Sequence, residues 1–158
     1  MQIETLKEQD LSAFAEIYVE FIESIRDIGF EIYYDYKPEM KEKMERVFSI
    51  AIKKPEWKIF VAKEKNKIIG FIAGDIRQTF FPYSKIEKIG YISAVYIAEE
   101  FRKEGLARKF EKKICDEFFS KHNIKYLELH CLTNNISAKK CWNNMGYETF
   151  REQLRKTL

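Results

Sequence analysis

The chain has 158 residues, 46% of them hydrophobic and 34% charged, with a formal net charge of +3 at pH 7. This composition excludes a disordered chain, and the length predicts one folded domain spanning residues 1–158. The small net charge and the lack of any known nucleic-acid motif argue against a nucleic-acid partner. Acidic residues also interrupt the basic stretch of the second half, at Glu99, Glu100, Glu104 and Glu111.

The sequence shows no membrane-spanning or targeting pattern. The longest apolar run, at residues 68–74, is too short to span a bilayer, and residues 1–4 do not begin a signal peptide. We therefore expect a cytoplasmic protein with no membrane partner. The three cysteines have no ligand-like spacing, so we expect reduced packing residues and no metal site.

Charge is distributed unevenly along the chain. Residues 1–79 contain 13 Lys and Arg against 15 Asp and Glu, whereas residues 80–158 contain 15 against 10. A basic half suits an anionic ligand, and an acidic half suits a cationic one. Solvated surface charge is the alternative for both halves.

Hydrophobic spacing predicts the elements of the first third. Residues 2–6 are a strand candidate, and apolar residues at helical spacing predict a helix over residues 11–26, which Gly29 ends. After an aromatic-rich link at residues 30–36, Pro38 begins a second amphipathic helix that extends to Ile52.

Strands dominate the middle of the chain. Residues 57–63 and 68–79 are predicted to form a hairpin around the polar loop 64–67. Gly70 and Gly74 in the second strand predict a bulge or a close backbone approach. A strand at residues 91–97 follows an aromatic loop.

The last third alternates helix and strand. A core-facing helix is predicted over residues 106–120 because four apolar residues recur at a spacing of four: Leu106, Phe110, Ile114 and Phe118. A strand at 125–133, a short helix within 134–147 and a strand at 147–154 complete the chain. The predicted order β-α-α-β-β-β-α-β-α-β indicates an α/β (α+β) fold with a mixed, mostly antiparallel sheet flanked by helices.

The turn before the helix at 106–120 has the composition of an anion site. Gly105 allows a tight turn and a close approach to a ligand, Ala107 leaves room, and a first helical turn presents unpaired N–H groups. Arg102, Lys103 and Arg108 add positive charge, so the turn can hold a pyrophosphate. An ordinary charged turn is the alternative for so short a motif.

Two ordered motifs resemble those of one family. Arg102-x-x-Gly105-x-Ala107 is similar to the (Gln/Arg)-x-x-Gly-x-(Gly/Ala) signature of the GNAT superfamily of acyl-CoA-dependent N-acetyltransferases. The residues that resemble the second signature of that family are Leu129, His130, Cys131, Asn135, Ala138, Cys141, Trp142, Gly146 and Tyr147. The resemblance covers nearly the whole chain and implies the GNAT fold, acetyl-CoA as cofactor and an amine as acceptor.

The resemblance also implies roles for individual residues. Backbone groups of Val95, Tyr96 and Ile97 are expected to hold the acetyl group and the pantetheine arm, because main-chain N–H groups stabilise charge on a thioester oxygen. The other residues implied to bind coenzyme A are Arg102, Lys103, Glu104, Gly105, Leu106, Ala107, Arg108, Asn135, Ala138 and Trp142. For Asn135, a helix cap is the alternative role.

By the same resemblance, the first two helices and their link form one wall of the acceptor site. The candidate substrate contacts on that wall are Tyr18, Tyr33, Tyr34 and Tyr36. Packing in the core or at the rim is the alternative for these aromatic residues.

His130 is the candidate general base, at a position where some members of the superfamily have a glutamate. Histidine, with a pKa of about 6.5, can accept a proton from an ammonium group at neutral pH. A surface histidine without a role is the alternative, and Glu87 and Ser93 are weaker candidates.

Trp142 departs from the family pattern, which has a tyrosine there that protonates the leaving thiolate. Indole is no useful acid. A thiol with a pKa of about 8.5 can leave as thiolate near neutral pH, so we expect a slower enzyme or one that uses another acid.

The sequence thus predicts an N-acetyltransferase in which an amine attacks the thioester of acetyl-CoA directly. The acceptor stays open between small-molecule amines and protein amines, and a homodimer stays open as the assembly. The alternative from another class is a non-catalytic acyl-CoA-binding or sensor protein of the same fold, because Trp142 replaces the acid and residues 91–97 contain no carboxylate.

Overall fold

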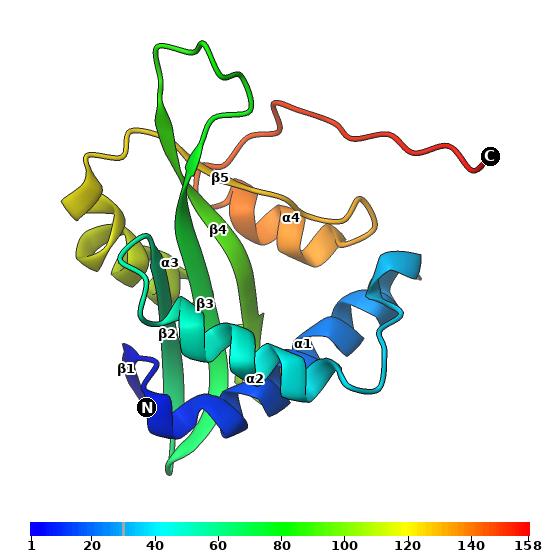
Figure 1. The fold of residues 1–158 in the computed structure, drawn as a ribbon. Coiled ribbons are helices and arrows are strands. Elements are labelled where there is room, and N and C mark those ends of the chain that lie inside the picture. Colours follow the sequence, from blue (N-terminus) through cyan, green and yellow to red (C-terminus); the bar gives the residue numbers. More distant parts are fainter. Residues whose placement is uncertain (30) are drawn as a thin grey trace.

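The computed structural model describes residues 1–29 and 31–158. Within these residues, one sheet has the strand order β1-β2-β3-β4-β5 and is accompanied by four α-helices (Figure 1). The strands are β1 (Gln2–Thr5), β2 (Trp57–Glu64), β3 (Lys67–Gln78), β4 (Lys88–Ile97) and β5 (Leu127–Leu129). The helices are α1 (Leu11–Gly29), α2 (Met40–Ala51), α3 (Leu106–Glu117) and α4 (Ile136–Asn143).

The sheet is mixed, as the sequence predicts. β1 to β4 pair antiparallel in chain order, and β5 pairs parallel to β4. A two-residue turn joins β2 to β3, in which Lys65 and Asn66 both have positive φ (48° and 66°). Such turns match the twist of paired strands, so the predicted hairpin is confirmed.

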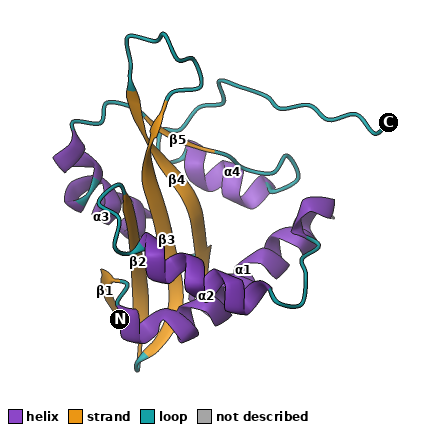
Figure 2. Cartoon of the chain, in the orientation of Figure 1, coloured by secondary structure: helices purple, strands orange, loops and turns teal. Residues whose placement is uncertain are grey.

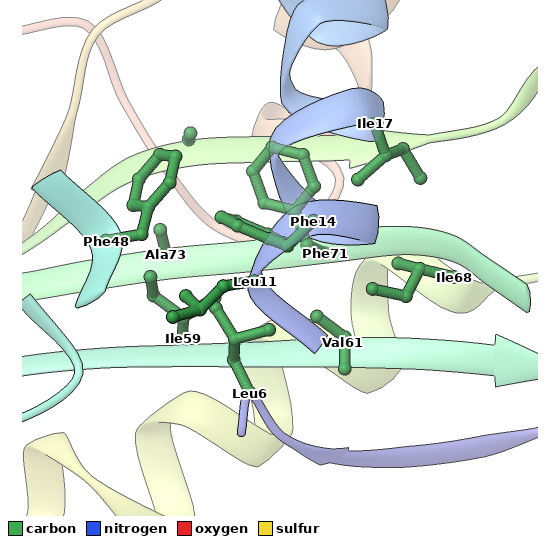
Figure 3. Packing of buried hydrophobic residues seen from close by; sticks show 11 residues of the cluster. Leu6, Leu11, Phe14, Ile17, Phe48, Ile59, Val61, Ile68, Phe71 and Ala73 are labelled. Carbon is green, nitrogen blue, oxygen red and sulfur yellow. The ribbon is translucent and has the colours of Figure 1, made fainter. Parts of the chain in front are cut away.

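Side chains alternate across β2 and β3 and form one core on each face of the sheet. Figure 2 shows α1 and α2 in front of the sheet and α3 behind it. On the front face, Phe14 lies edge-on to Phe48 and Phe71, with ring centroids 4.7 and 4.9 Å apart (Figure 3). On the rear face, the buried residues of α3 follow the predicted spacing of four: Leu106, Phe110 and Ile114.

Gly70 and Gly74 allow close contacts inside the sheet. A Cβ atom at Gly70 would lie 2.7 Å from the backbone oxygen of Tyr96, and one at Gly74 would lie 2.7 Å from Ile114 Cδ1. The pairing register also shifts beside both glycines, so the predicted bulge and close approach are confirmed.

Several predicted boundaries are wrong. The strand predicted over residues 125–133 is only Leu127–Leu129, and the helix predicted over 106–120 ends at Glu117 because Phe118 leaves helical geometry (φ −124°, ψ −66°). The link predicted at residues 30–36 contains a short 3-10 helix, Ile32–Tyr34. Phe30, the first residue of that link, lies outside the described residues.

The final strand predicted over residues 147–154 is also wrong. Residues 148–158 are exposed and have no regular secondary structure (Figure 2). A strand needs a neighbour for its backbone hydrogen bonds, and in the described sheet this segment has none. The observed order is therefore β-α-α-β-β-β-α-β-α.

Neither a membrane-spanning helix nor a metal-binding group of side chains occurs in the described residues. Nowhere in residues 1–29 and 31–158 does a helix combine the length and apolar character needed to cross a membrane. The same residues contain no group of three or more His, Cys, Asp or Glu side chains arranged to hold a metal ion.

Candidate active site

The turn between β4 and α3 presents unpaired backbone N–H groups. Lys103 and Gly105 have left-handed backbone geometry, with φ of 69° and 76°. In the described part of the chain, no N–H group of residues 103–108 donates to a backbone carbonyl, whereas Lys109 N–H donates to Gly105 O at 3.2 Å. The start of α3 therefore has the free donors and the positive dipole end that bind anions.

Two arginines attach this turn to its surroundings. Arg102 Nε donates to the carbonyl of Ile97 at the end of β4 (2.9 Å), and Arg108 Nη2 donates to the carbonyl of Asn144 after α4 (3.1 Å). Each guanidinium keeps further N–H groups, and Lys103 adds a third positive charge. The donors and charges fit a diphosphate.

The second half of β4 has an open edge. β5 pairs with β4 only at Gly90, Tyr91 and Ile92, so residues 93–97 have β3 on one side and no neighbouring strand on the other in the described sheet. The register with β3 moves from Ile92 to Ala94, which leaves Ser93 as the extra residue of a bulge. The bulge re-aims the strand where β4 and β5 separate.

A cavity of about 790 Å³ lies along this open edge. It extends between α4 and the C-terminal half of α1, which reach past the β4 side of the sheet in Figure 1. The predicted residues that line it are Tyr18, Tyr34, Val95, Tyr96, Ile97, Arg102, Lys103, Gly105, Leu106, Ala107, Arg108, His130, Asn135, Ala138 and Trp142. A second cavity of about 350 Å³, beside Trp57 and Phe118, contains none of the predicted site residues.

Three predicted site residues do not line the cavity. Glu104 is exposed in the turn. Tyr33 is 75% exposed and lies under the guanidinium of Arg155, 4.7 Å from its ring centroid. Tyr36 donates its hydroxyl to Glu23 at 2.6 Å. The predicted contacts of Tyr33 and Tyr36 are not supported, because these link side chains turn toward other partners. The side chain of Glu104 does not line the cavity, whereas its backbone N–H is one of the unpaired donors of the turn.

Asn135 and Trp142 belong to the α4 wall of the cavity. Asn135 caps α4 by accepting the N–H of Ala138 on its side-chain oxygen (3.1 Å). Trp142 packs edge-on against Tyr147, with ring centroids 5.2 Å apart, and Tyr147 donates to Glu111 at 3.4 Å. Tyr147 is therefore a packing residue behind the wall.

His130 follows directly after β5 and faces a polar network. Its Nδ1 lies 2.6 Å from Tyr91 Oη. The guanidinium of Arg77 stacks 3.7 Å from the Tyr91 ring centroid and pairs with Asp75, a carboxylate that is only 3% exposed. Loss of hydration and then the charge of Arg77 lower the pKa of His130, so the imidazole is neutral at pH 7.

The C-terminal half of α1 forms an apolar wall that the sequence pattern does not distinguish from core. The cavity-lining residues of this helix beyond Tyr18 are Phe21, Ile22, Ser24, Ile25 and Ile28. The lining residues of the opposite wall outside the predicted set include Cys131, Leu132, Ser137, Lys140, Cys141 and Met145. Helical periodicity identifies the α1 face, but only its position against β4 shows that part of it faces a cavity.

The fold, the anion-binding turn and the open β4 edge together define an acetyltransferase of the GNAT class. The model of the acetyltransferase (GNAT) family matches residues 18–147, and the chain belongs to that family. It is thus an acetyl-CoA-dependent N-acetyltransferase, and the resemblance of the two sequence motifs is confirmed.

Individual relatives are distant. An uncharacterized N-acetyltransferase of Archaeoglobus fulgidus is 26% identical over 140 residues, which cover 89% of this chain and 88% of that protein. A tetramutant of the BH1408 protein from Bacillus halodurans has a TM-score of 0.79 at 21% identity, covering 100% of both chains. The aminoglycoside N-acetyltransferase AAC(6')-Iy in complex with CoA has a TM-score of 0.79 at 11% identity, covering 99% and 93%. These structural likenesses establish the fold, whereas the acceptor has to be argued from the cavity.

Proposed function

We propose that this chain, as one domain, transfers an acetyl group from acetyl-CoA to a primary amine by direct attack of the amine nitrogen on the thioester. One observation carries the proposal: the same cavity connects the unpaired N–H groups of the α3 turn, the open edge of β4 and His130. These are the groups that hold a cofactor, stabilise charge and accept a proton.

Acetyl-CoA supplies the acetyl group as an activated thioester. In the proposal, the N–H groups of residues 103–108 hold its diphosphate together with Arg102 and Lys103. The open edge of residues 95–97 holds the arm and donates to the thioester oxygen. Asn135 already uses its side-chain oxygen in the α4 cap, which leaves its NH₂ group to donate to the arm.

His130 takes a proton from the bound ammonium group, which leaves the neutral amine free to attack. In the productive tautomer, Nδ1–H donates to Tyr91 Oη, and the unprotonated Nε2 accepts the proton of the amine. The lowered pKa of His130 keeps the imidazole ready to accept at neutral pH.

Direct attack is favoured over an acyl-cysteine because both cavity thiols are poor nucleophiles. Cys131 and Cys141 line the cavity, and burial raises the pKa of each. The thiolate, not the thiol, is the nucleophile, so these side chains stay protonated and inert near pH 7.

Other hydroxyls can supply the acid that Trp142 lacks. Tyr18, Tyr34 and Tyr96 line the same cavity, and burial raises the pKa of each, which keeps the phenols protonated as donors. The leaving group can also depart as thiolate near neutral pH.

The test is acetyl-CoA consumption with a panel of primary amines. We expect amine-dependent loss of the thioester well above background hydrolysis, with the acetylated amine as product. The competing function is a non-catalytic acyl-CoA-binding protein, which Trp142 favours. Acetyl-CoA that raises the melting temperature while no amine increases thioester loss would support that competing function and contradict the proposal.

A further inference from the structure

We infer that the acceptor is a small amine with one positive charge on an apolar aliphatic or aromatic body, and not a polycation. This inference rests on the proposed function and names the substrate class of the same cavity. It follows from what lines the acceptor wall and from the charges that are missing there.

The acceptor wall is apolar. From α1 it receives Phe21, Ile22, Ile25 and Ile28, and from the following link Tyr34. The polar side chains on this wall are hydroxyls, those of Ser24, Tyr18 and Tyr34, and Ser24 donates its hydroxyl to the carbonyl of Phe21 at 2.7 Å. Burying the apolar surface of a ligand against this wall favours binding, whereas the wall offers no partner to a charged group.

Acidic side chains are missing from the cavity. Among the described residues that line it there is no Asp or Glu, whereas Arg102, Lys103, Arg108 and Lys140 all contribute. Sequence charge alone favoured a cationic ligand for the acidic first half. The carboxylates of that half do not reach the cavity lining.

Three carboxylates on or beside α1 are held by other groups, and Asp75 is paired with Arg77. Glu31 forms a two-point ion pair with Arg155 at 2.7 and 3.1 Å. Glu23 accepts the hydroxyl of Tyr36 at 2.6 Å, and Glu20, on the exposed face of α1, accepts from Tyr96 at 3.4 Å. None of the three lines the cavity.

A polycation is therefore a poor ligand for this site. A monoamine transfers its only positive charge to His130, beside the polar network of Tyr91 and Arg77, so no second ammonium group has to lie against the apolar wall. A polyamine or aminoglycoside would bring further ammonium groups next to apolar side chains with no carboxylate in the lining, where an unpaired charge is strongly unfavourable.

The experiment compares kcat/KM for two sets of primary amines with the full chain and saturating acetyl-CoA. The apolar set is butylamine, hexylamine and phenethylamine; the polycationic set is spermidine and kanamycin. We expect hexylamine to exceed butylamine by about fifteenfold, since each of its two additional buried methylenes contributes about fourfold. We also expect every polycation to be at least roughly tenfold worse than hexylamine.

A charge-inserting variant provides the reciprocal test. Ile28→Glu places a carboxylate on the wall at a side chain that is 44% exposed, and we expect it to raise kcat/KM for spermidine roughly two- to fivefold while lowering that for hexylamine. Ile50→Glu makes the same change on the exposed side of α2, at a side chain that is 53% exposed and outside the cavity lining. Ile50→Glu should leave kcat/KM unchanged for both spermidine and hexylamine.

Two results would overturn the inference. Turnover of spermidine or kanamycin equal to or better than hexylamine would refute the acceptor class and leave the proposed transferase intact. Absence of amine-dependent turnover with both sets would remove the proposed function and, with it, this inference. A wild-type preference for hexylamine that Ile28→Glu weakens and Ile50→Glu retains would support it.

Discussion

The contact between Tyr91 and His130 controls which imidazole nitrogen carries the proton. If Tyr91 donates to Nδ1, the neutral ring is protonated at Nε2 and cannot accept there; if Nδ1–H donates to Tyr91, Nε2 is free. The sequence predicts His130 as the base but does not predict this contact. It depends on the parallel register that pairs Tyr91 with Glu128 across β4 and β5, 37 positions apart, and a register of that kind has no local signal.

Replacing His130 tests the base directly. We expect His130→Ala to lower kcat at pH 7 by roughly a hundredfold, which is a typical contribution of general base catalysis. Because the pKa of His130 is lowered, wild-type kcat should decrease only as the pH drops below about 6.5. In His130→Ala this decrease of kcat at acid pH should be absent. Steady-state rates between pH 5 and pH 8 are the measurement.

The chain contains its own control for this substitution. His122 is the other histidine, on a 3-10 helix where its Nδ1 lies 2.9 Å from the carbonyl of Phe118, and it does not line the cavity. His122→Ala should keep wild-type kcat. Equal losses in the two variants, or an unchanged pH profile in His130→Ala, would exclude His130 as the base.

Asn135 has two roles that substitution can separate. Its side-chain oxygen caps α4, so Asn135→Ala should reduce the free energy of unfolding by about 1 kcal/mol, whereas Asn135→Ser keeps a capping oxygen and should lose less. If the NH₂ group also holds the cofactor arm, both variants should bind coenzyme A more weakly. Thermal unfolding and calorimetric titration measure the two effects; wild-type affinity in Asn135→Ser would leave only the cap.

At the scale of elements, the turn and α3 are the best-predicted part of the site. The spacing of Leu106, Phe110 and Ile114 correctly predicts a buried face, and Gly105 correctly predicts a tight turn before it. The open edge of β4 is not predicted, because it results from the bulge at Ser93 and from the shortness of β5. Both depend on pairing partners distant in sequence.

Gly105 and Gly146 share a left-handed backbone geometry, so substituting each one separates the effect on folding from the effect on binding at the α3 turn. Gly105 and Gly146 both have positive φ (76° and 92°), and an added Cβ at either would meet no atom within 4 Å. Gly105→Ala and Gly146→Ala should each cost about 1–2 kcal/mol of stability. Gly105→Ala alone should weaken coenzyme A binding, because relief of strain moves the N–H groups of residues 103–108.

Calorimetric titration of both variants with coenzyme A is the measurement. The loss of affinity in Gly105→Ala should be several times that in Gly146→Ala at matched melting temperature. Similar affinities in the two variants would show that the geometry of this turn does not determine cofactor binding.

At the scale of the whole molecule, the sequence predicts the order of elements up to α4 and fails after it. The alternating residues after Tyr147 suggest a strand, but Phe150 is 62% exposed and Leu154 is 90% exposed. Residues 148–158 instead make isolated surface contacts. Arg151 stacks over Phe80 in the β3–β4 loop, and Arg155 pairs with Glu31 beyond α1. Sequence alternation shows only that a strand can form, whereas a partner edge decides whether it does.

The overall charge distribution is likewise a weak guide to the ligands. The basic second half does supply the cations at the α3 turn, as the sequence suggests. Acidic residues of the first half instead form surface ion pairs such as Lys41–Glu16 and Lys53–Glu8. Exposed pairs of this kind contribute little to stability and do not define a binding site.

The central claim is that unpaired backbone N–H groups at the start of α3 hold the cofactor beside β4. The most direct measurement is a titration of the ¹⁵N-labelled protein with coenzyme A, followed by the backbone amide resonances. We predict saturable shifts concentrated at residues 103–108 and along residues 95–97, with the amides of the β2–β3 turn unchanged. Binding of coenzyme A that leaves the amides of residues 103–108 unshifted would contradict the account.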